Sequence, residues 1–205
     1  MARPAADRFE VRERILDAAE DLLGRFGYRK MTVDDLAAAA GLSKGAIYLH
    51  FQSKEDIALA RIDRVIGELL VELERLARSE LPAAKRLREM LITRVLFRLD
   101  RVRSYRETID QLVAAIRTRL LEARREHHRR EAELFAAVVR DGIRSHELRP
   151  CVAKRAGEAL VVATNALLPA DLRPEEIDTR QVRRRVETIA DLFLHGIVLP
   201  PRGKR

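Results

Sequence analysis

Apolar residues recur at helical spacing near the N-terminus, where they predict an amphipathic first helix. They fall on one face of the segment VRERILDAAEDLLGRFG, at Ile15, Leu16, Ala19, Leu22, Leu23 and Phe26. Gly27 follows this stripe, and glycine commonly ends a helix. We therefore expect the first helix to stop near residue 27.

Three further helices are expected after this stop, each preceded by a residue that caps helix N-termini. The caps are Thr32, Ser43 and Ser53. An aspartate stands three residues after the first and the last of these caps, at Asp35 and Asp56, which is the spacing of a capping box. Short turns with glycine between such helices, as at Gly41, are typical of a helix-turn-helix.

The rest of the chain is also helical, and no segment predicts a strand. The longer helical segments are expected at 54–76, 83–99, 104–114, 116–146, 152–168 and 180–199. The sequence therefore predicts an all-α protein of about nine helices. It divides into an N-terminal three-helix module with the helix-turn-helix, residues 1–56, and a larger helical domain, residues 57–205.

Charge alone does not mark the N-terminal module as a nucleic-acid surface. The chain of 205 residues has a formal net charge of +8, but residues 1–55 hold nine basic and nine acidic residues.

The single cysteine, and the lack of an apolar leader or of an apolar run of about 20 residues, predict a cytoplasmic protein without a membrane span. No nucleophile–base pair, phosphate loop or metal motif indicates an enzyme, and we expect no cofactor and no metal.

The third helix, at residues 44–51, carries an unusual outward face. On a helical wheel, Ile47 and Phe51 share the side that can enter a core. The opposite arc and its margins hold Lys44, Gly45, Ala46, Tyr48, Leu49 and His50. Apolar and aromatic side chains beside a lysine and a glycine suit contact with the major groove of DNA. The alternative is that these are ordinary surface residues of a three-helix bundle.

Residues 12–60 resemble the DNA-binding domain of the TetR family of bacterial transcriptional regulators. The resemblance rests on the stretch ILDAAEDLLGRFGYRKMTVDDLAAAAGLSKGAIYLHFQSKEDI. It implies that the third helix lies in the major groove through Lys44, Gly45, Ala46, Tyr48 and Leu49. It also implies DNA contacts, chiefly to the backbone, at Thr32, Val33, Ser43, His50 and Lys54. Relatives often carry a hydroxyl group at position 46, and the alanine here lacks that hydrogen-bonding group. The sequence therefore does not indicate which bases this position prefers.

The resemblance further implies that residues 57–205 form a ligand-binding and dimerisation domain, and that a homodimer binds a palindromic double-stranded operator. Two stripes on the last two helices are the expected seam between subunits. The first is Ala159, Val162, Ala163 and Ala166, and the second is Val182, Val186, Ile189, Phe193 and Ile197. The alternative is that both stripes belong to the core of one subunit.

The long segment 116–146 has two polar residues in its apolar stripe. His127 and Glu131 lie four residues apart and so meet on one side of a helix. They could line a ligand cavity, share a metal ion, or simply hydrogen-bond to each other. Further candidates for a cavity are Phe97, Tyr105, Phe135 and Asn165. Cys151 is expected to be a small buried residue.

The expected function is that of a repressor that leaves its operator when a small molecule binds the helical domain. The alternative is a DNA-bound scaffold or activator that has no inducer and recruits a protein partner.

Overall fold

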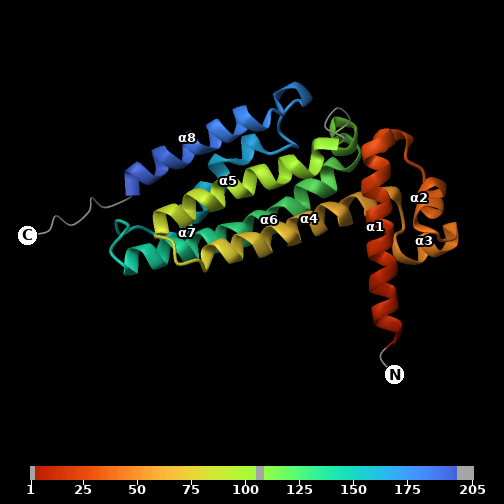
Figure 1. The fold of residues 1–205 in the computed structure, drawn as a ribbon, viewed down its shortest axis with the longest axis horizontal. Coiled ribbons are helices and arrows are strands. Elements are labelled where there is room, and N and C mark those ends of the chain that lie inside the picture. The colour runs from red at the N-terminus through yellow and green to blue at the C-terminus, as the bar shows by residue number, and fades with distance from the viewer. Residues whose placement is uncertain (1–2, 105–108, 198–205) are drawn as a thin grey trace, which may run out of the picture. The chain divides into compact units, whose positions relative to one another are not determined.

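The computed structural model describes residues 3–104 and 109–197, and these residues form eight α-helices and no β-strand (Figure 1). The helices are α1 (Arg3–Lys30), α2 (Val33–Ala40), α3 (Lys44–His50), α4 (Lys54–Ala77), α5 (Ala83–Val102), α6 (Ile109–Arg144), α7 (Ala153–Ala163) and α8 (Thr179–Ile197). Short 3-10 turns cover Asn165–Leu167 and Pro174–Glu176. The all-α prediction is confirmed. The segments expected at 104–114 and 116–146 are one helix from Ile109 onward, which accounts for the lower number of helices.

The chain groups into two compact units, which divide within α4 between Val65 and Ile66. The N-terminal unit comprises Met1–Val65 with Val102–Leu121, and the C-terminal unit comprises Ile66–Arg101 with Glu122–Arg205. The first part of α6 belongs to the N-terminal unit because it buries apolar side chains there, including Leu112 and Ile116. In addition, Arg119 Nη2 lies 2.6 Å from Asp56 Oδ1 in the first turn of α4.

The core of the N-terminal unit confirms most of the predicted apolar face of α1. Ile15, Leu16, Ala19, Leu22 and Leu23 are buried, but Phe26 is 52% exposed, so its expected place in the core is wrong. The backbone at Gly27 has φ 72° and ψ 170°, which interrupts the helical spacing. The next residue, Tyr28, then turns into the core in place of Phe26.

Caps define the short helices as the sequence predicted. Thr32 Oγ1 accepts a hydrogen bond from the backbone N–H of Asp35 at 3.1 Å, and the Asp35 carboxylate accepts from the backbone N–H of Thr32 at 3.0 Å, a complete capping box. Ser43 Oγ accepts from the backbone N–H of Ala46 at 3.1 Å. Gly41 has φ 63°, in the left-handed region that favours glycine, and it turns the chain between α2 and α3.

In the C-terminal unit, α7 packs closely on α6 at a glycine. A Cβ atom built on Gly157 would lie 2.4 Å from the carbonyl oxygen of Ala132, so only glycine fits this approach. Helix α7 is shorter than the expected 152–168, because the backbone leaves helical geometry at Thr164. Cys151 is exposed, which contradicts its expected burial. Within the described ranges, no helix combines the length and apolar character needed to span a membrane.

Candidate nucleic-acid interface and effector groove

Helix α3 is anchored on one side and presents the predicted residues on the other. Ile47 and Phe51 are buried in the N-terminal unit. Tyr48 is 48% exposed and Leu49 is 77% exposed, and Lys44 and Gly45 are exposed beside them. Exposing a leucine and a tyrosine on a helix of seven residues forgoes the stabilisation of burying them, on the order of 2 kcal/mol each. Ala46 and His50 are half-buried at the margins of this face.

The structure pairs Lys44 with an acidic residue that the sequence analysis did not consider. Lys44 Nζ lies 2.9 Å from Asp34 Oδ2, and both side chains are exposed. The hydrogen bond to Asp34, together with the charge of that carboxylate, raises the pKa of Lys44. Asp34 lies ten residues before Lys44, and only the turn between α2 and α3 brings the two side chains together. The basic character of the face is therefore offset locally by Asp34 in the free protein.

Lys54 is held by the N-terminal unit itself. Its Nζ donates to the carbonyl oxygens of Tyr28 at 3.0 Å and Met31 at 3.1 Å, and lies 4.3 Å from the centre of the Tyr28 ring. The Tyr28 hydroxyl in turn donates to Glu55 Oε1 at 2.9 Å. Burial, together with this hydrogen bond to Glu55, raises the pKa of Tyr28. In the free protein Lys54 thus joins the start of α4 to the end of α1, a role that competes with its predicted contact with the DNA backbone.

The other residues expected at the DNA backbone lie at the two caps. The hydroxyl groups of Thr32 and Ser43 are both exposed and both accept from backbone N–H groups of their own helices. Val33 follows Thr32 in the first turn of α2 and is half-buried. The hydroxyl groups of Thr32 and Ser43 thus fix where the two helices begin.

Glu131 lies fully buried in the C-terminal unit as the counter-ion of two arginines. Its Oε2 accepts from Arg94 Nε at 2.5 Å, and its Oε1 accepts from Arg98 Nη2. Burial by itself would raise the pKa of Glu131, but the positive charges of Arg98 and Arg94 hold it below its usual range. Both carboxylate oxygens are engaged by arginines. The ion triad therefore explains the burial of Glu131, and neither a metal ion nor His127 is needed for it.

Arg94 also satisfies the polar residues at the end of α7. Its Nη1 donates to Thr164 Oγ1 and its Nη2 donates to Asn165 Oδ1, each at 2.7 Å. Burial lowers the pKa of Arg94 to about 10. Sequence reasoning missed Arg94 and Arg98. The available signal was their spacing of four residues within the apolar stripe that contains Leu87, Leu91 and Val95.

The remaining cavity candidates do not converge on one site. Phe135 is fully buried and packs in the core, and His127 is half-buried on α6. Tyr105 lies outside the described residues. In the part of the chain that the structure covers, no three His, Cys, Asp or Glu side chains are grouped to hold a metal ion.

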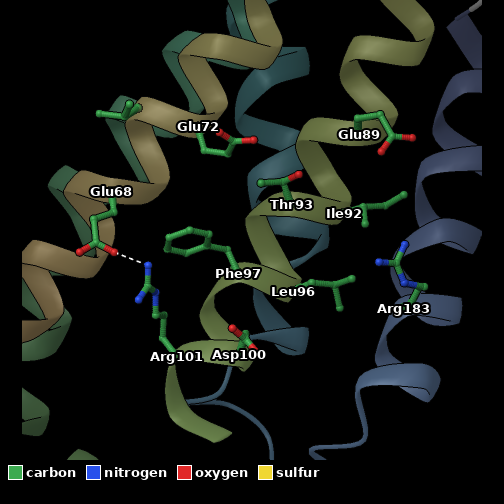
Figure 2. Close-up of a pocket in the computed structure, with 11 residues that line it drawn as sticks. Glu68, Glu72, Glu89, Ile92, Thr93, Leu96, Phe97, Asp100, Arg101 and Arg183 are labelled. Atoms are coloured by element: carbon green, nitrogen blue, oxygen red, sulfur yellow. Dashed lines mark ion pairs between the residues drawn. The ribbon is translucent and has the colours of Figure 1, made fainter. Parts of the chain in front are cut away.

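Phe97 instead lines a surface groove of the C-terminal unit. The groove has a volume of about 630 Å³ and is formed by α4, α5 and α8. In Figure 2, α5 runs between α4 and α8, with Phe97 turned toward α4 and Leu96 toward α8. Arg101 Nη2 lies 2.6 Å from Glu68 Oε2, and the Arg101 guanidinium lies 4.9 Å from the centre of the Phe97 ring. This volume is in the range of small-molecule sites.

The two stripes expected at the dimer seam differ in exposure. On α7 and the following turn, Ala159, Val162, Ala163 and Ala166 are all exposed. On α8, Val182 and Val186 are fully buried in the core of their own chain, so their expected place at a seam is wrong. Ile189, Phe193 and Ile197 are half-buried, and the neighbouring Leu192 is 72% exposed. The apolar residues that face outward on α8 are therefore Ile189, Leu192 and Phe193, and not Val182 and Val186.

Comparison with known sequences supports the resemblance at the N-terminus. A family model described as "Bacterial regulatory proteins, tetR family" matches residues 15–60. The transcriptional regulator EthR of Mycobacterium tuberculosis is 40% identical over 78 residues, which are 38% of this chain and 35% of EthR. The match thus spans about a third of that relative. The transcriptional repressor KstR2 of Rhodococcus jostii is 30% identical over 142 residues, 67% of this chain and 68% of KstR2.

Solved structures share the fold over nearly the whole chain. SmeT, the repressor of the multidrug efflux pump SmeDEF of Stenotrophomonas maltophilia, is 26% identical with a TM-score of 0.66, covering 93% of this chain and 91% of SmeT. A TetR-family transcriptional regulator from Pectobacterium atrosepticum is 21% identical with a TM-score of 0.74, covering 98% and 100% of the two chains. At 21% identity, that second likeness concerns the fold alone.

Proposed function

The chain belongs to the tetR family of bacterial regulatory proteins, and we propose that it is a homodimeric repressor that binds a palindromic operator and is released by a small-molecule ligand. The observation that carries the DNA-binding part is the exposed face of α3. There, Tyr48 and Leu49 stand in solvent beside Lys44, while the core side of the same helix is filled by Ile47 and Phe51. A helix anchored in this way can enter the major groove without rearranging its own core.

Gly45 supports the same proposal because nothing within the chain requires a glycine there. A Cβ atom at position 45 would meet only Ser43 Oγ, at 3.8 Å, which is ordinary contact. Gly45 lies in the first turn of α3, and glycine is less stable than alanine in a helix by up to about 1 kcal/mol. A close approach of the helix backbone to DNA explains why the chain retains a glycine at this exposed position.

The Lys44–Asp34 ion pair is the feature that DNA would exchange. Lys44 is exposed and charged, so it can leave the carboxylate and meet a phosphate or a guanine. An exposed ion pair contributes about 0 to 1 kcal/mol, so breaking it costs little. Asp34 therefore keeps Lys44 paired until a partner offers Lys44 a stronger acceptor.

The apolar face that remains uncovered in one chain supports the proposed homodimer. Val162 on α7 and Leu192 on α8 are both largely exposed, and small residues surround Val162. Pairing these faces about a two-fold axis would bury them in a bundle of four helices. Two α3 helices related in this way can meet successive major-groove faces about 34–36 Å apart, or a multiple of this distance.

Release by a ligand requires that binding in the C-terminal unit changes the N-terminal unit. Helices α4 and α6 contribute residues to both units. In the C-terminal unit, α6 is fixed by Glu131 through Arg94 and Arg98, and in the N-terminal unit it is fixed by Arg119 on Asp56. A ligand that binds more tightly to a state with a different placement of α6 or α4 would lower the affinity for DNA. The decrease is limited by the difference between the ligand's binding free energies for the two states.

The test is selection of DNA from a random pool, followed by fluorescence anisotropy with the selected duplex. We expect a palindromic site and an affinity that falls steeply as salt rises, because charged contacts to phosphates release counter-ions. Binding that ignores sequence, or that shows no dependence on salt, would contradict the proposal. The mass of the free protein and of its DNA complex, measured by analytical ultracentrifugation, tests the dimer.

A further inference from the structure

The groove of Figure 2 is acidic although the chain as a whole is basic. The chain has a net charge of +8, yet the groove is lined by the carboxylates of Glu68, Glu72, Glu89 and Asp100 and by only two arginines. Arg101 pairs with Glu68 at 2.6 Å, and Arg183 pairs with Glu187 at 3.7 Å. Two of the lining carboxylates are paired with arginines outside the lining, Glu72 with Arg75 at 2.6 Å and Glu89 with Arg88 at 3.8 Å. Carboxylates thus outnumber guanidinium groups in the lining, and the partly exposed Glu68–Arg101 pair is the place where another cation can exchange with an arginine.

Apolar surface in the groove suits an occupant that is more than a simple ion. Val71 is 69% exposed on the α4 side, and Phe97, Leu96 and Ile92 line the α5 side. Exposed aromatic and aliphatic groups next to carboxylates offer burial to an apolar body and a counter-charge to its cation.

The chain places a cation of its own at this position. The Arg101 guanidinium stacks over Phe97, with 4.9 Å to the ring centre, and pairs with Glu68. An aromatic face and a carboxylate that converge on one guanidinium form the arrangement in which proteins bind organic cations. Figure 2 shows this pair at the α4 side of the groove.

We propose that the groove binds a lipophilic organic cation, which displaces Arg101 from Phe97 and Glu68. This assignment rests on the proposed function, because it names the chemical class of the releasing ligand. The ammonium, phosphonium or amidinium group of the ligand takes the place of the guanidinium, and its apolar body covers Val71 and Leu96.

Displacement of Arg101 removes a contact close to the positions where α4 and α5 pass between the two units. Arg101 is the last residue of α5 assigned to that unit, and Glu68 lies two residues after α4 enters it. The Arg101–Glu68 ion pair joins α4 to α5 at these points. A ligand that breaks this pair removes a link between the two helices and so can bias the placement of α4.

The test is isothermal titration calorimetry of the full chain with tetraphenylphosphonium, a lipophilic cation. We expect binding that weakens about tenfold in Glu68→Gln and in Phe97→Leu, since each removes one half of the cation site. We expect Arg101→Gln to bind several-fold more tightly, because it removes the competing guanidinium. Circular dichroism melting of each variant checks that the fold is retained.

Two controls separate charge from apolar contact. Tetraphenylborate has nearly the same shape and the opposite charge, and its binding should not weaken in Glu68→Gln. Glu126→Gln removes an equal charge from an exposed position on α6, outside the groove, and should leave tetraphenylphosphonium binding unchanged.

The inference is overturned by the absence of tetraphenylphosphonium binding up to about millimolar concentration, where the free energy of binding is about 4 kcal/mol. It is equally overturned if Glu68→Gln and Phe97→Leu bind as the unaltered chain does, or if Arg101→Gln binds more weakly. Sequence-specific DNA binding, measured on the same ligand-free samples, tests the proposed function separately from the groove.

Discussion

Lys44 Nζ lies 2.9 Å from Asp34 Oδ2, so an acidic residue of α2 holds the first residue of the proposed reading helix in the free protein. We expect Asp34→Asn to bind operator DNA about three- to tenfold more tightly, because Lys44 is then free and one repulsive charge is removed. The free energy of unfolding should change by less than about 0.5 kcal/mol, since the pair is exposed. Anisotropy titrations at several salt concentrations measure this.

The matched control for Asp34→Asn is Glu126→Gln, which changes the net charge equally in the C-terminal unit. Equal tightening in both variants would show that only the net charge matters, and would contradict a specific role for Asp34.

Lys54 is expected to stabilise the N-terminal unit and not to contact a phosphate. Lys54→Met should lower the free energy of unfolding by about 1 to 2 kcal/mol, because two partly buried carbonyl oxygens lose their donor. The salt dependence of DNA binding should stay as it is. If Lys54 neutralised a phosphate, the slope of log K against log salt would fall by about 0.9, with little change in thermal stability.

Glu131 compensates two buried arginines, so its removal should be costly. We expect Glu131→Gln to destabilise the protein by about 3 kcal/mol, because Arg94 and Arg98 then remain buried without a counter-ion. Denaturant unfolding measures the loss. Glu133→Gln, at an exposed position on the same helix, should change stability by less than about 0.5 kcal/mol. Equal effects of the two substitutions would contradict the role given to the triad.

His128 should make the C-terminal unit sensitive to mild acid. Burial, followed by the nearby charge of Arg94, lowers the pKa of His128 to about 4. The unfolded chain takes up this proton near pH 6.5, whereas the folded chain does not, so stability is complete above pH 6.5 and falls as the pH is lowered toward 4. Between pH 7 and pH 5 the loss should be about 1 kcal/mol, after allowing for the part of the ring that stays in water.

The control for this pH dependence is a second histidine. His128→Gln should flatten the fall in stability between pH 7 and pH 5. His146→Asn alters an exposed histidine that has φ 60°, a conformation that asparagine tolerates, and it should leave the fall unchanged. The interpretation fails if both variants follow the pH profile of the unaltered chain.

Local signals predicted the N-terminal unit well because its helices are short and strongly capped. Thr32 with Asp35, and Ser43 at the start of α3, act through residues only three positions away, so their spacing is visible in the sequence. Phe26 was misplaced because the apolar stripe was taken to continue to the last residue before Gly27, whereas Tyr28, just after the non-helical backbone of Gly27, enters the core instead.

The C-terminal unit was harder to predict because its decisive contacts join distant residues. Arg94 meets Glu131 across 37 positions and Asn165 across 71, and periodicity on one helix gives no sign of either partner. The same holds for the groove, since Glu68 and Arg101 come from different helices. Val182 and Val186 form a true apolar stripe, but a stripe alone does not distinguish a core within one chain from a seam between two.

The central claim, that the exposed face of α3 approaches DNA closely, is tested most directly at Gly45. Gly45→Ala and Gly67→Ala each add one methyl group inside a helix without a clash, since nothing lies within 4 Å of a Cβ atom at Gly67. Each should therefore stabilise the free protein by up to about 1 kcal/mol. We predict that Gly45→Ala weakens specific operator binding at least tenfold while Gly67→Ala leaves it unchanged. Equal operator affinity of the two variants and the unaltered chain would contradict the claim.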